Sequence, residues 1–291
     1  MGPRLLCYII ALFFCNSIIA EDYALVWSEE FDYVGEPDPT KWTYEQGFVR
    51  NHEWQWYQPQ NAYVRDGMLT IVAREEHFLN PTFNPQSNYW GCKRDSVHCT
   101  SACVITNGRQ TFLYGRIEVR ARIPATPGTW PAIWLLGAQR NLPPTERTPW
   151  PYCGEVDIME YYPVNGMPHI HANACWGGKD GNSVWDSKAT PVEKWTRANP
   201  QWASQFHVWK MDWDKDSIRI YLDDELLNEI DLSQTINGKY GEDNPFHQPM
   251  YLLLNLAMGS TGGQVDTQTM PARYDIDYVR YYVKEGSYKG I

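Results

Sequence analysis

Three acidic residues that lie close together in the chain could carry out acid–base or nucleophilic chemistry. Glu155, Asp157 and Glu160 fall in the stretch Gly154-Glu155-Val156-Asp157-Ile158-Met159-Glu160. Two carboxyl groups about 5 Å apart are what a retaining glycosidase needs, one as nucleophile and one as general acid and then base. Calcium binding is the alternative, but calcium prefers about six to eight oxygens in a flexible loop, whereas apolar residues alternate with acids here. The pattern favours catalysis over metal binding.

The strand that carries these acids must be irregular if all three are to face one surface. Side chains alternate along a strand, so Glu155 and Asp157 share a face and Glu160 would point to the opposite one. One extra residue in a β-bulge, most simply Met159, restores the parity. Carboxylates aimed at one surface repel each other, a cost that a purely structural strand has no reason to carry. We predict a bulge at or beside Met159, with Asp157 hydrogen-bonded to a neighbouring acid and influencing which one holds the proton.

The remaining sequence predicts short strands joined by tight turns. Polar and apolar residues alternate with period two in 68–73, 115–123 and 217–222. Turn-forming pairs recur between such runs, and no long segment has a helical apolar stripe. These features predict an all-β sandwich of two antiparallel sheets. The Pro-, Asn-, Ser- and Cys-rich stretch 77–102 is predicted to be a long surface loop that could form one wall of a cleft.

The N-terminus resembles a targeting signal. Arg4 precedes an apolar run that ends on the small residue Ala20, so residues 1–20 are predicted to be a secretory signal peptide and the protein to be extracellular or periplasmic. A membrane anchor is the weaker alternative, because the run is short and no basic flank follows it. With no repeat or linker to divide it, 21–291 is expected to form a single catalytic domain.

Composition restricts the choice of partner. The formal net charge is −10, and removal of Arg4 with the signal makes it −11, so nucleic acid, anionic membranes and sulfated polymers should be repelled. The chain has 14 Trp and 19 Tyr, more than one core requires, and flat aromatic faces stack on sugar rings. We therefore expect a monomer that acts on a neutral polysaccharide and has no membrane contact once the signal is removed.

Five cysteines remain after the signal, an odd number for an oxidising compartment. Cys92, Cys99 and Cys103 lie near His98, where a local disulfide is favoured over a zinc site because the spacing matches no standard ligand pattern. Cys153 and Cys175 flank the predicted catalytic hairpin and could face each other closely enough to form a disulfide.

The acidic stretch resembles the active-site signature Glu-x-Asp-x-x-Glu of glycoside hydrolase family 16. Further segments resemble that family's landmarks in its own order: 27–31, 51–57, 114–122, 130–135, 249–257 and 277–280. The resemblance implies a β-jelly-roll of two curved sheets with a sugar cleft across the concave one, Glu155 as nucleophile, Glu160 as acid/base and Asp157 as their partner. The extra residue Met159 is similar to the family's laminarinase-like branch, which implies an endo-β-glucanase acting on β-1,3 or mixed β-1,3/1,4 glucans without a catalytic cofactor.

The resemblance also implies residues that bind glucose units on the non-reducing side of the cut: Asn51, Arg116, Trp130 and Trp134. From the residues alone, Arg116 could be a plain strand charge and Trp134 a core residue. Period two in the strand after the Asn165-Gly166 turn places His171 and Asn173 on one face, where they would meet the carboxylates if that face is the cleft. A lone histidine in a strand is more often structural.

Many members of the family hold a structural calcium ion, and the matching positions here are Glu30, Gly67 and Asp277. The chain departs from many laminarinases after the strand that ends near Ala257, where those proteins have a Trp and this chain reads Met258-Gly259-Ser260-Thr261-Gly262-Gly263, so one aromatic wall of the cleft is expected to be missing. Two other functions stay open: a non-catalytic glucan-recognition protein, although such proteins lack the glutamates, and a hydrolase of another neutral polysaccharide such as agar.

Overall fold

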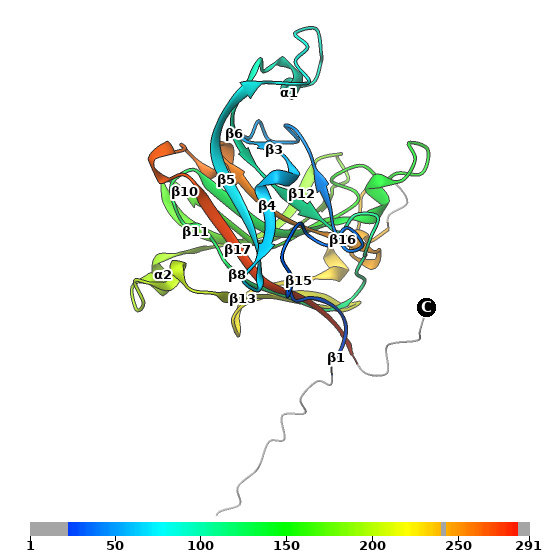
Figure 1. Ribbon diagram of the computed structural model, residues 1–291. Helices are drawn as coiled ribbons and strands as arrows, with labels where there is room; N and C mark the ends of the chain where they lie inside the picture. The colour runs from blue at the N-terminus through cyan, green and yellow to red at the C-terminus, as the bar shows by residue number, and fades with distance from the viewer. Residues whose placement is uncertain (1–22, 240–242, 285–291) are drawn as a thin grey trace, which may run out of the picture.

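Two β-sheets lie face to face in the computed structural model, which describes residues 23–239 and 243–284 (Figure 1). The predicted signal peptide lies outside the described residues. The larger sheet, called the outer sheet here, runs in the order β15 (Glu225–Asp231), β14 (Ser217–Leu222), β13 (His207–Trp213), β8 (Gly115–Arg122), β17 (Ala272–Lys284), β5 (Met68–Leu79), β6 (Ser96–Ser101) and β3 (Trp56–Tyr57), with β1 (Tyr23–Glu29) on β17 and β4 (Ala62–Arg65) on β5.

The second sheet, called the cleft sheet here, runs in the order β12 (Ser183–Pro191), β11 (Met167–Gly177), β10 (Glu155–Val164), β9 (Thr129–Gly137), β16 (Met250–Met258), β7 (Cys103–Ile105) and β2 (Thr43–Glu45). Neighbouring strands are antiparallel except for β3 and β6. Helix is confined to α1 (Trp90–Lys93), α2 (Glu193–Thr196) and short 3-10 turns within the described ranges. The predicted all-β jelly-roll is confirmed.

The core lies between the sheets and follows from alternation along the strands. In β8, Ile117, Val119 and Ala121 are buried while the intervening charged residues are partly exposed. From the cleft sheet, Val156 of β10 and Leu252 of β16 enter the same apolar cluster. Each strand of the cleft sheet therefore has one face fixed by the core, which leaves the other face free to line a site.

The β10–β11 hairpin positions the acidic residues. Asn165 and Gly166 both have positive φ, 52° and 79°, as a two-residue hairpin turn requires, and Val164 pairs with Met167 across it. The register then shifts between Asp157 and Glu160 on the β11 side, and between Asp157 and Met159 on the β9 side.

At that shift Ile158 and Met159 are both fully buried in the core cluster, so Asp157 and Glu160 face the same side. The bulge predicted at or beside Met159 is confirmed, and it comprises Ile158 and Met159.

The segment 77–102 is a loop only in part, and the prediction that it forms a wall of the cleft is wrong, because none of its residues lines the cleft. It is a hairpin that comprises the end of β5, an irregular stretch at 80–89, the short helix α1 and β6, and the tip that carries α1 projects beyond the rest of the outer sheet (Figure 1). Arg94 in this hairpin donates hydrogen bonds to the backbone carbonyls of His52 and Glu53, and the Tyr89 hydroxyl donates to those of Phe48 and Val49. The hairpin thus supports, from behind, the segment that carries Arg50, Asn51 and Glu53.

No helix in the described ranges is long and apolar enough to span a lipid bilayer.

Candidate active site

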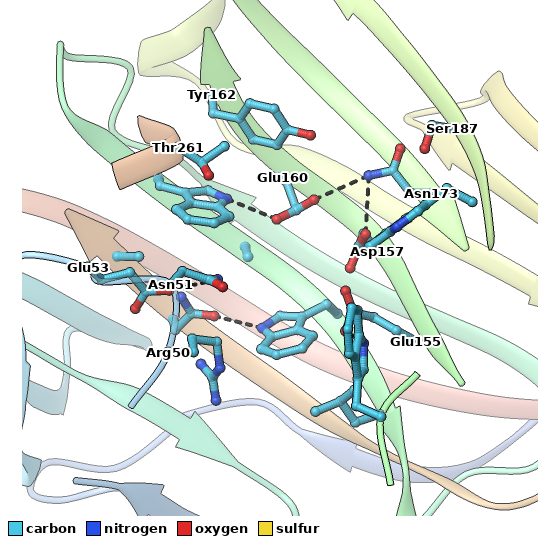
Figure 2. A pocket seen from close by; sticks show the side chains of 18 of the residues that line it. Arg50, Asn51, Glu53, Glu155, Asp157, Glu160, Tyr162, Asn173, Ser187 and Thr261 are labelled. Atoms are coloured by element: carbon cyan, nitrogen blue, oxygen red, sulfur yellow. Dashed lines mark hydrogen bonds between the residues drawn. The ribbon is translucent and has the colours of Figure 1, made fainter. Parts of the chain in front are cut away.

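A cleft of about 490 Å³ crosses the cleft sheet on the side away from the core. Figure 2 shows the three acids at its base, with Asn51 and Glu53 on one side and Asn173 and Ser187 on the other. Its lining residues are Arg50, Asn51, Glu53, Trp130, Ala132, Trp134, Leu136, Arg140, Trp150, Glu155, Asp157, Glu160, Tyr162, Asn173, Trp185, Ser187, Asn255, Ala257 and Thr261.

The three acids meet in this cleft because the bulge gives them a common face. Asp157 is almost fully buried between the glutamates, which are partly accessible. Asn173 Nδ2 donates to Asp157 Oδ2 at 3.1 Å and to Glu160 Oε2 at 3.2 Å (Figure 2). A hydrogen bond also joins the carboxyl groups of Asp157 and Glu160, which requires a proton on one of them. Asn173, predicted from strand parity, therefore ties Asp157 to Glu160.

Each glutamate receives a hydrogen bond from its own indole. Trp130 Nε1 donates to Glu160 Oε1 at 2.9 Å, and Trp150 Nε1 donates to Glu155 Oε2 at 2.9 Å. Trp130 was expected in the site, but sequence reasoning missed Trp150. Its Trp-Pro pair five residues before Glu155 gave a signal for a constrained turn, yet nothing in the sequence showed that the turn folds back over the strand.

Burial and mutual repulsion raise the proton affinity of the acidic cluster. Burial, followed by the charge of Glu160, raises the pKa of Glu155 to about 7, against the opposing effects of the Trp150 hydrogen bond, Arg50 and Arg140. Burial also raises the pKa of Glu160 to about 7, opposed by hydrogen bonds from Trp130, Asp157 and Asn173. The pKa of Asp157 lies well above its ordinary value, chiefly through burial. The cluster can therefore keep Asp157 protonated and hold a second proton on one of the two glutamates near neutral pH, which leaves the other glutamate ionised.

The two indoles should control opposite limbs of the pH–rate profile. Trp150→Phe removes a donor to the Glu155 carboxylate, so its pKa should rise and the acidic limb should move to higher pH. Trp130→Phe removes a donor to the Glu160 carboxylate, so the pKa of Glu160 should rise. Glu160 should then keep its proton to higher pH, and the alkaline limb should move to higher pH. A hydrogen bond to a charged group contributes about 1.5–3 kcal/mol, and partial solvation of the indoles reduces this to a shift of up to about one pH unit.

The measurement is kcat/KM against pH for both variants and the parent enzyme. A variant that lowers activity equally at every pH, with both limbs unmoved, would show that its indole does not tune the carboxyl group.

On the β16 side of the acids, buried polar groups line the cleft. Trp134 belongs to a second apolar cluster, separate from the core between the sheets, and it also lines the cleft. Its Nε1 donates to Asn255 Oδ1 at 2.7 Å. The Arg50 guanidinium lies over the Trp134 ring at 4.9 Å and forms an ion pair with Glu45. The sequence offered two alternatives for Trp134, a buried packing residue or a cleft residue, and the structure combines them.

Asn51 lies in the cleft as expected, in the positive-φ segment before β3. Its Nδ2 donates to Glu53 Oε1 at 3.2 Å, and Gln55 Nε2 donates to the other oxygen of Glu53 at 2.6 Å. Burial raises the pKa of Glu53. Sequence reasoning did not name Glu53 or Arg50, although both fall in or beside a segment that it had singled out.

His171 stands opposite Glu160 in the register but is not among the residues that line the cleft. Its ring stacks on Tyr162 with centroids 3.5 Å apart, and Nε2 lies 3.2 Å from the Tyr162 carbonyl oxygen, so this nitrogen carries the proton. Burial lowers its pKa to about 4, which keeps the ring neutral. The expectation that His171 binds substrate is corrected: it supports Tyr162, which does line the cleft.

Arg116 is not a cleft residue, and its predicted role in substrate binding is wrong. It lies on β8 in the outer sheet, where it forms a two-point ion pair with Asp212 and stacks over Tyr23. Alternation along β8 directs Arg116 away from the core, and the cleft is on the other sheet. The alternative of a plain strand charge is the correct one.

The three residues suggested for a calcium ion do not fit one as they are arranged. Glu30 forms two hydrogen bonds with Arg280, and Asp277 pairs with Arg120, so each carboxylate is already neutralised by a guanidinium group. Gly67 lies in the turn between β4 and β5. Calcium binding would require both arginines to release these carboxylates.

The cysteines form neither of the expected disulfides. Cys92, Cys99, Cys103, Cys153 and Cys175 are all free thiols. Cys99 and Cys103 lie on separate strands that enter different apolar clusters, and Cys175 pairs in register with Glu155 rather than with Cys153. Within the described residues no group of three or more His, Cys, Asp or Glu could hold a metal, which also leaves the zinc alternative without support.

The bulged strand presents two glutamates to the cleft, each with an indole donor, and a buried aspartate lies between them. This arrangement is suited to breaking a glycosidic bond, and the protein is a glycoside hydrolase. It belongs to family 16, because the model of that family, described as "Glycosyl hydrolases family 16", matches residues 48–280.

Similar proteins share the fold but differ in what their names say they cleave. The β-glucanase of Rhodothermus marinus is 35% identical over 90% of this chain and 86% of that protein. The keratan-sulfate endo-1,4-β-galactosidase of Sphingobacterium multivorum is 29% identical over 92% of this chain and 57% of that protein.

Among solved structures, the laminarinase from Rhodothermus marinus superposes with a TM-score of 0.70 at 34% identity, covering 90% of this chain and 98% of that one. A structure from work on endo-acting O-glycanases of the human gut microbiota that initiate mucin breakdown gives 0.78 at 33% identity, covering 90% and 91%.

Proposed function

We propose that this enzyme is an endo-acting β-glucanase that hydrolyses β-1,3 or mixed β-1,3/1,4 glucans with retention of configuration. The observation that carries this proposal is the pair Glu155 and Glu160, brought to one face of β10 by the bulge and served by separate indole donors. The similarity to the β-glucanase and laminarinase of Rhodothermus marinus supports glucan as the substrate class. The acidic overall charge favours a neutral chain.

In the first step, the Glu155 carboxylate attacks the anomeric carbon while Glu160 gives its proton to the departing glycosidic oxygen. The Glu155–Trp150 hydrogen bond orients the attacking group. As Glu160 becomes negative, the donors from Trp130, Asn173 and Asp157 stabilise its charge. In the second step, Glu160 takes a proton from water, which attacks the glycosyl-enzyme and releases the sugar with its original configuration.

A non-catalytic recognition protein is disfavoured by the raised pKa values of these glutamates. Burying paired carboxylates costs free energy that binding of a neutral glucan does not require, whereas acid–base catalysis does require it. We further propose a secreted monomer that needs no cofactor for catalysis, a proposal supported by the signal-like N-terminus and by a cleft whose chemistry is complete in its own side chains.

Another substrate class is favoured by one observation. Arg140 lines the cleft near Glu155, and within the described part of the chain no ion pair neutralises it. A free guanidinium could bind an anionic substituent such as a sulfate on a galactan, in keeping with the similarity to the keratan-sulfate galactosidase and to the structure from the O-glycanase work.

One digestion panel distinguishes these substrates. Laminarin, lichenan, barley β-glucan, agarose, keratan sulfate and mucin O-glycans would be incubated separately with the enzyme, and the released oligosaccharides identified by mass spectrometry. We expect internal cleavage of laminarin or of the mixed-linkage glucans. Cleavage confined to keratan sulfate or mucin would replace the glucanase proposal with the galactan one, and Arg140→Gln should then lower activity on sulfated chains more than on desulfated ones.

A further inference from the structure

We propose that Trp185 on the edge strand β12 is the stacking platform for the part of the substrate that leaves, and so determines how much chain the enzyme needs beyond the scissile bond. The inference rests on the proposed hydrolase function and assigns one of its specificity residues.

The strand register places Trp185 in line with the nucleophile. Glu155 of β10 pairs with Cys175 of β11, and Cys175 pairs with Trp185 of β12. Directly paired residues in a sheet point to the same face, so these three side chains form one row on the cleft face of the sheet, and the two end members, Glu155 and Trp185, line the cleft. With strands about 4.8 Å apart, Trp185 lies about 10 Å from Glu155, beyond the first sugar ring past the cut bond.

Short polar side chains line the cleft between the acids and Trp185. Cys175, the middle member of the row, is fully buried and does not line the cleft, whereas Asn173 and Ser187 of the next row along β11 and β12 do. Of the lining residues contributed by β11 and β12, namely Asn173, Trp185 and Ser187, Trp185 is the one aromatic. A sugar chain that crosses the acids toward β12 therefore meets a shallow trough that ends at this indole.

The indole of Trp185 is held by a hydrogen bond and is partly exposed to solvent. Its Nε1 donates to Ser183 Oγ at 3.2 Å, two residues back on the same strand, and the residue is 43% exposed. Its ring makes no aromatic contact within the described part of the chain. An exposed Trp on an edge strand invites aggregation, so its presence is better explained by a ligand that covers it.

The side of the cleft identifies which end of the substrate reaches Trp185. Asn51 and Trp134, expected at sugar units on the non-reducing side, lie on the β16 side of β10. β12 lies on the opposite side, two strands away. The units near Trp185 are therefore those that leave with the protonated oxygen in the first step and that return as acceptors when a sugar replaces water in the second.

Trp185→Ala tests this assignment with two kinds of substrate. The first is the polysaccharide that the digestion panel shows to be cleaved. The second is a nitrophenyl glycoside of the matching oligosaccharide, whose leaving group is too short to reach Trp185. We expect kcat/KM for the polysaccharide to fall about tenfold or more and that for the nitrophenyl glycoside to stay within about twofold. Transfer to an added oligosaccharide acceptor should fall in parallel, and Trp185→Phe should restore most of both.

Val184→Ala is the matched control, since Val184 is also exposed on β12 but points to the other face. Equal losses on both substrates, or unchanged polysaccharide cleavage, would overturn the role of Trp185. If the enzyme cleaves a galactan and no β-glucan, the glucanase proposal alone is overturned. The parent enzyme and Trp185→Ala would then be compared on the galactan and on its nitrophenyl glycoside.

Discussion

Replacing Glu155 by Gln is expected to lower kcat by about 10³-fold or more on whichever polysaccharide the enzyme cleaves, and Glu160→Gln should do nearly the same. Glutamine keeps the shape and hydrogen-bonding reach of each side chain but can neither attack the anomeric carbon nor donate a proton. Glu193→Gln is the matched control, because Glu193 is an exposed glutamate on α2, lies outside the cleft and forms an exposed ion pair with Arg197.

The two glutamates should be distinguishable by the leaving group. A dinitrophenyl glycoside needs no proton to depart, so Glu160→Gln should retain the first step on it, whereas Glu155→Gln should not. Azide added to Glu160→Ala should attack the glycosyl-enzyme and yield a β-glycosyl azide. An α-azide from that variant would contradict retention, and substantial activity left in either glutamine variant would contradict the catalytic assignment.

Folding of these variants can be checked through their stability. Burial raises both glutamate pKa values above those of the unfolded chain, so the folded protein keeps protons that the unfolded chain releases between about pH 4.5 and 7. Stability due to these groups therefore falls as pH rises through that window. The glutamine variants should melt at or above the temperature of the parent protein at pH 8 and match it near pH 5, which separates lost chemistry from lost fold.

Local parity was enough to predict the centre of the site. Side-chain alternation along β10 depends only on neighbouring residues. The sequence alone therefore showed that a regular strand would point Glu160 to the wrong face and that a bulge at or beside Met159 was needed, before the partner strands were known. Asn173 followed in the same way, once the Asn165-Gly166 turn fixed how β11 returns beside β10.

Residues that depend on the assignment of strands to sheets could not be predicted as well. A strand of the outer sheet has the same alternating pattern as one of the cleft sheet, so the pattern around Arg116 gave no sign of which sheet holds β8. Trp150 and Arg50 reach the cleft from loops, whose paths depend on tertiary contacts such as the Arg94 hydrogen bonds to the 52–53 backbone. His171 faced the predicted side, but its stacking on Tyr162 could not be inferred from the spacing.

The departure in the segment 258–263 agrees with the lining of the cleft. Met258 is buried in the core between the sheets, and the residues from this part of the chain that line the cleft are Ala257 and Thr261. The expected loss of an aromatic wall here is consistent with that lining. We therefore expect sugar stacking to depend on other aromatic residues that line the cleft, such as Trp130, Trp134 and Trp185.

Changing the length of the bulge should separate the position of Glu160 from its chemistry. Insertion of one alanine between Met159 and Glu160 should turn Glu160 and Tyr162 toward the core and lower kcat about as much as Glu160→Gln, because the acid would no longer face the cleft. Deletion of Met159 should instead leave Glu160 on the cleft face by strict alternation. Its cost should be mainly in stability, about 2–5 kcal/mol for the loss of a fully buried methionine side chain.

An alanine inserted between Asn165 and Gly166 is the control, since the turn at the hairpin tip can absorb it without altering the face of the acids. The measurements are kcat on the cleaved polysaccharide and the free energy of unfolding for all three variants. The opposite result would contradict the role given to the bulge: a folded deletion variant without activity, together with an active Met159–Glu160 insertion variant. In that case side-chain alternation along β10 would not decide whether Glu160 faces the cleft. The expected order, with the deletion more active than the insertion, follows from the fact that Ile158 and Met159 share the core while the acids share the cleft.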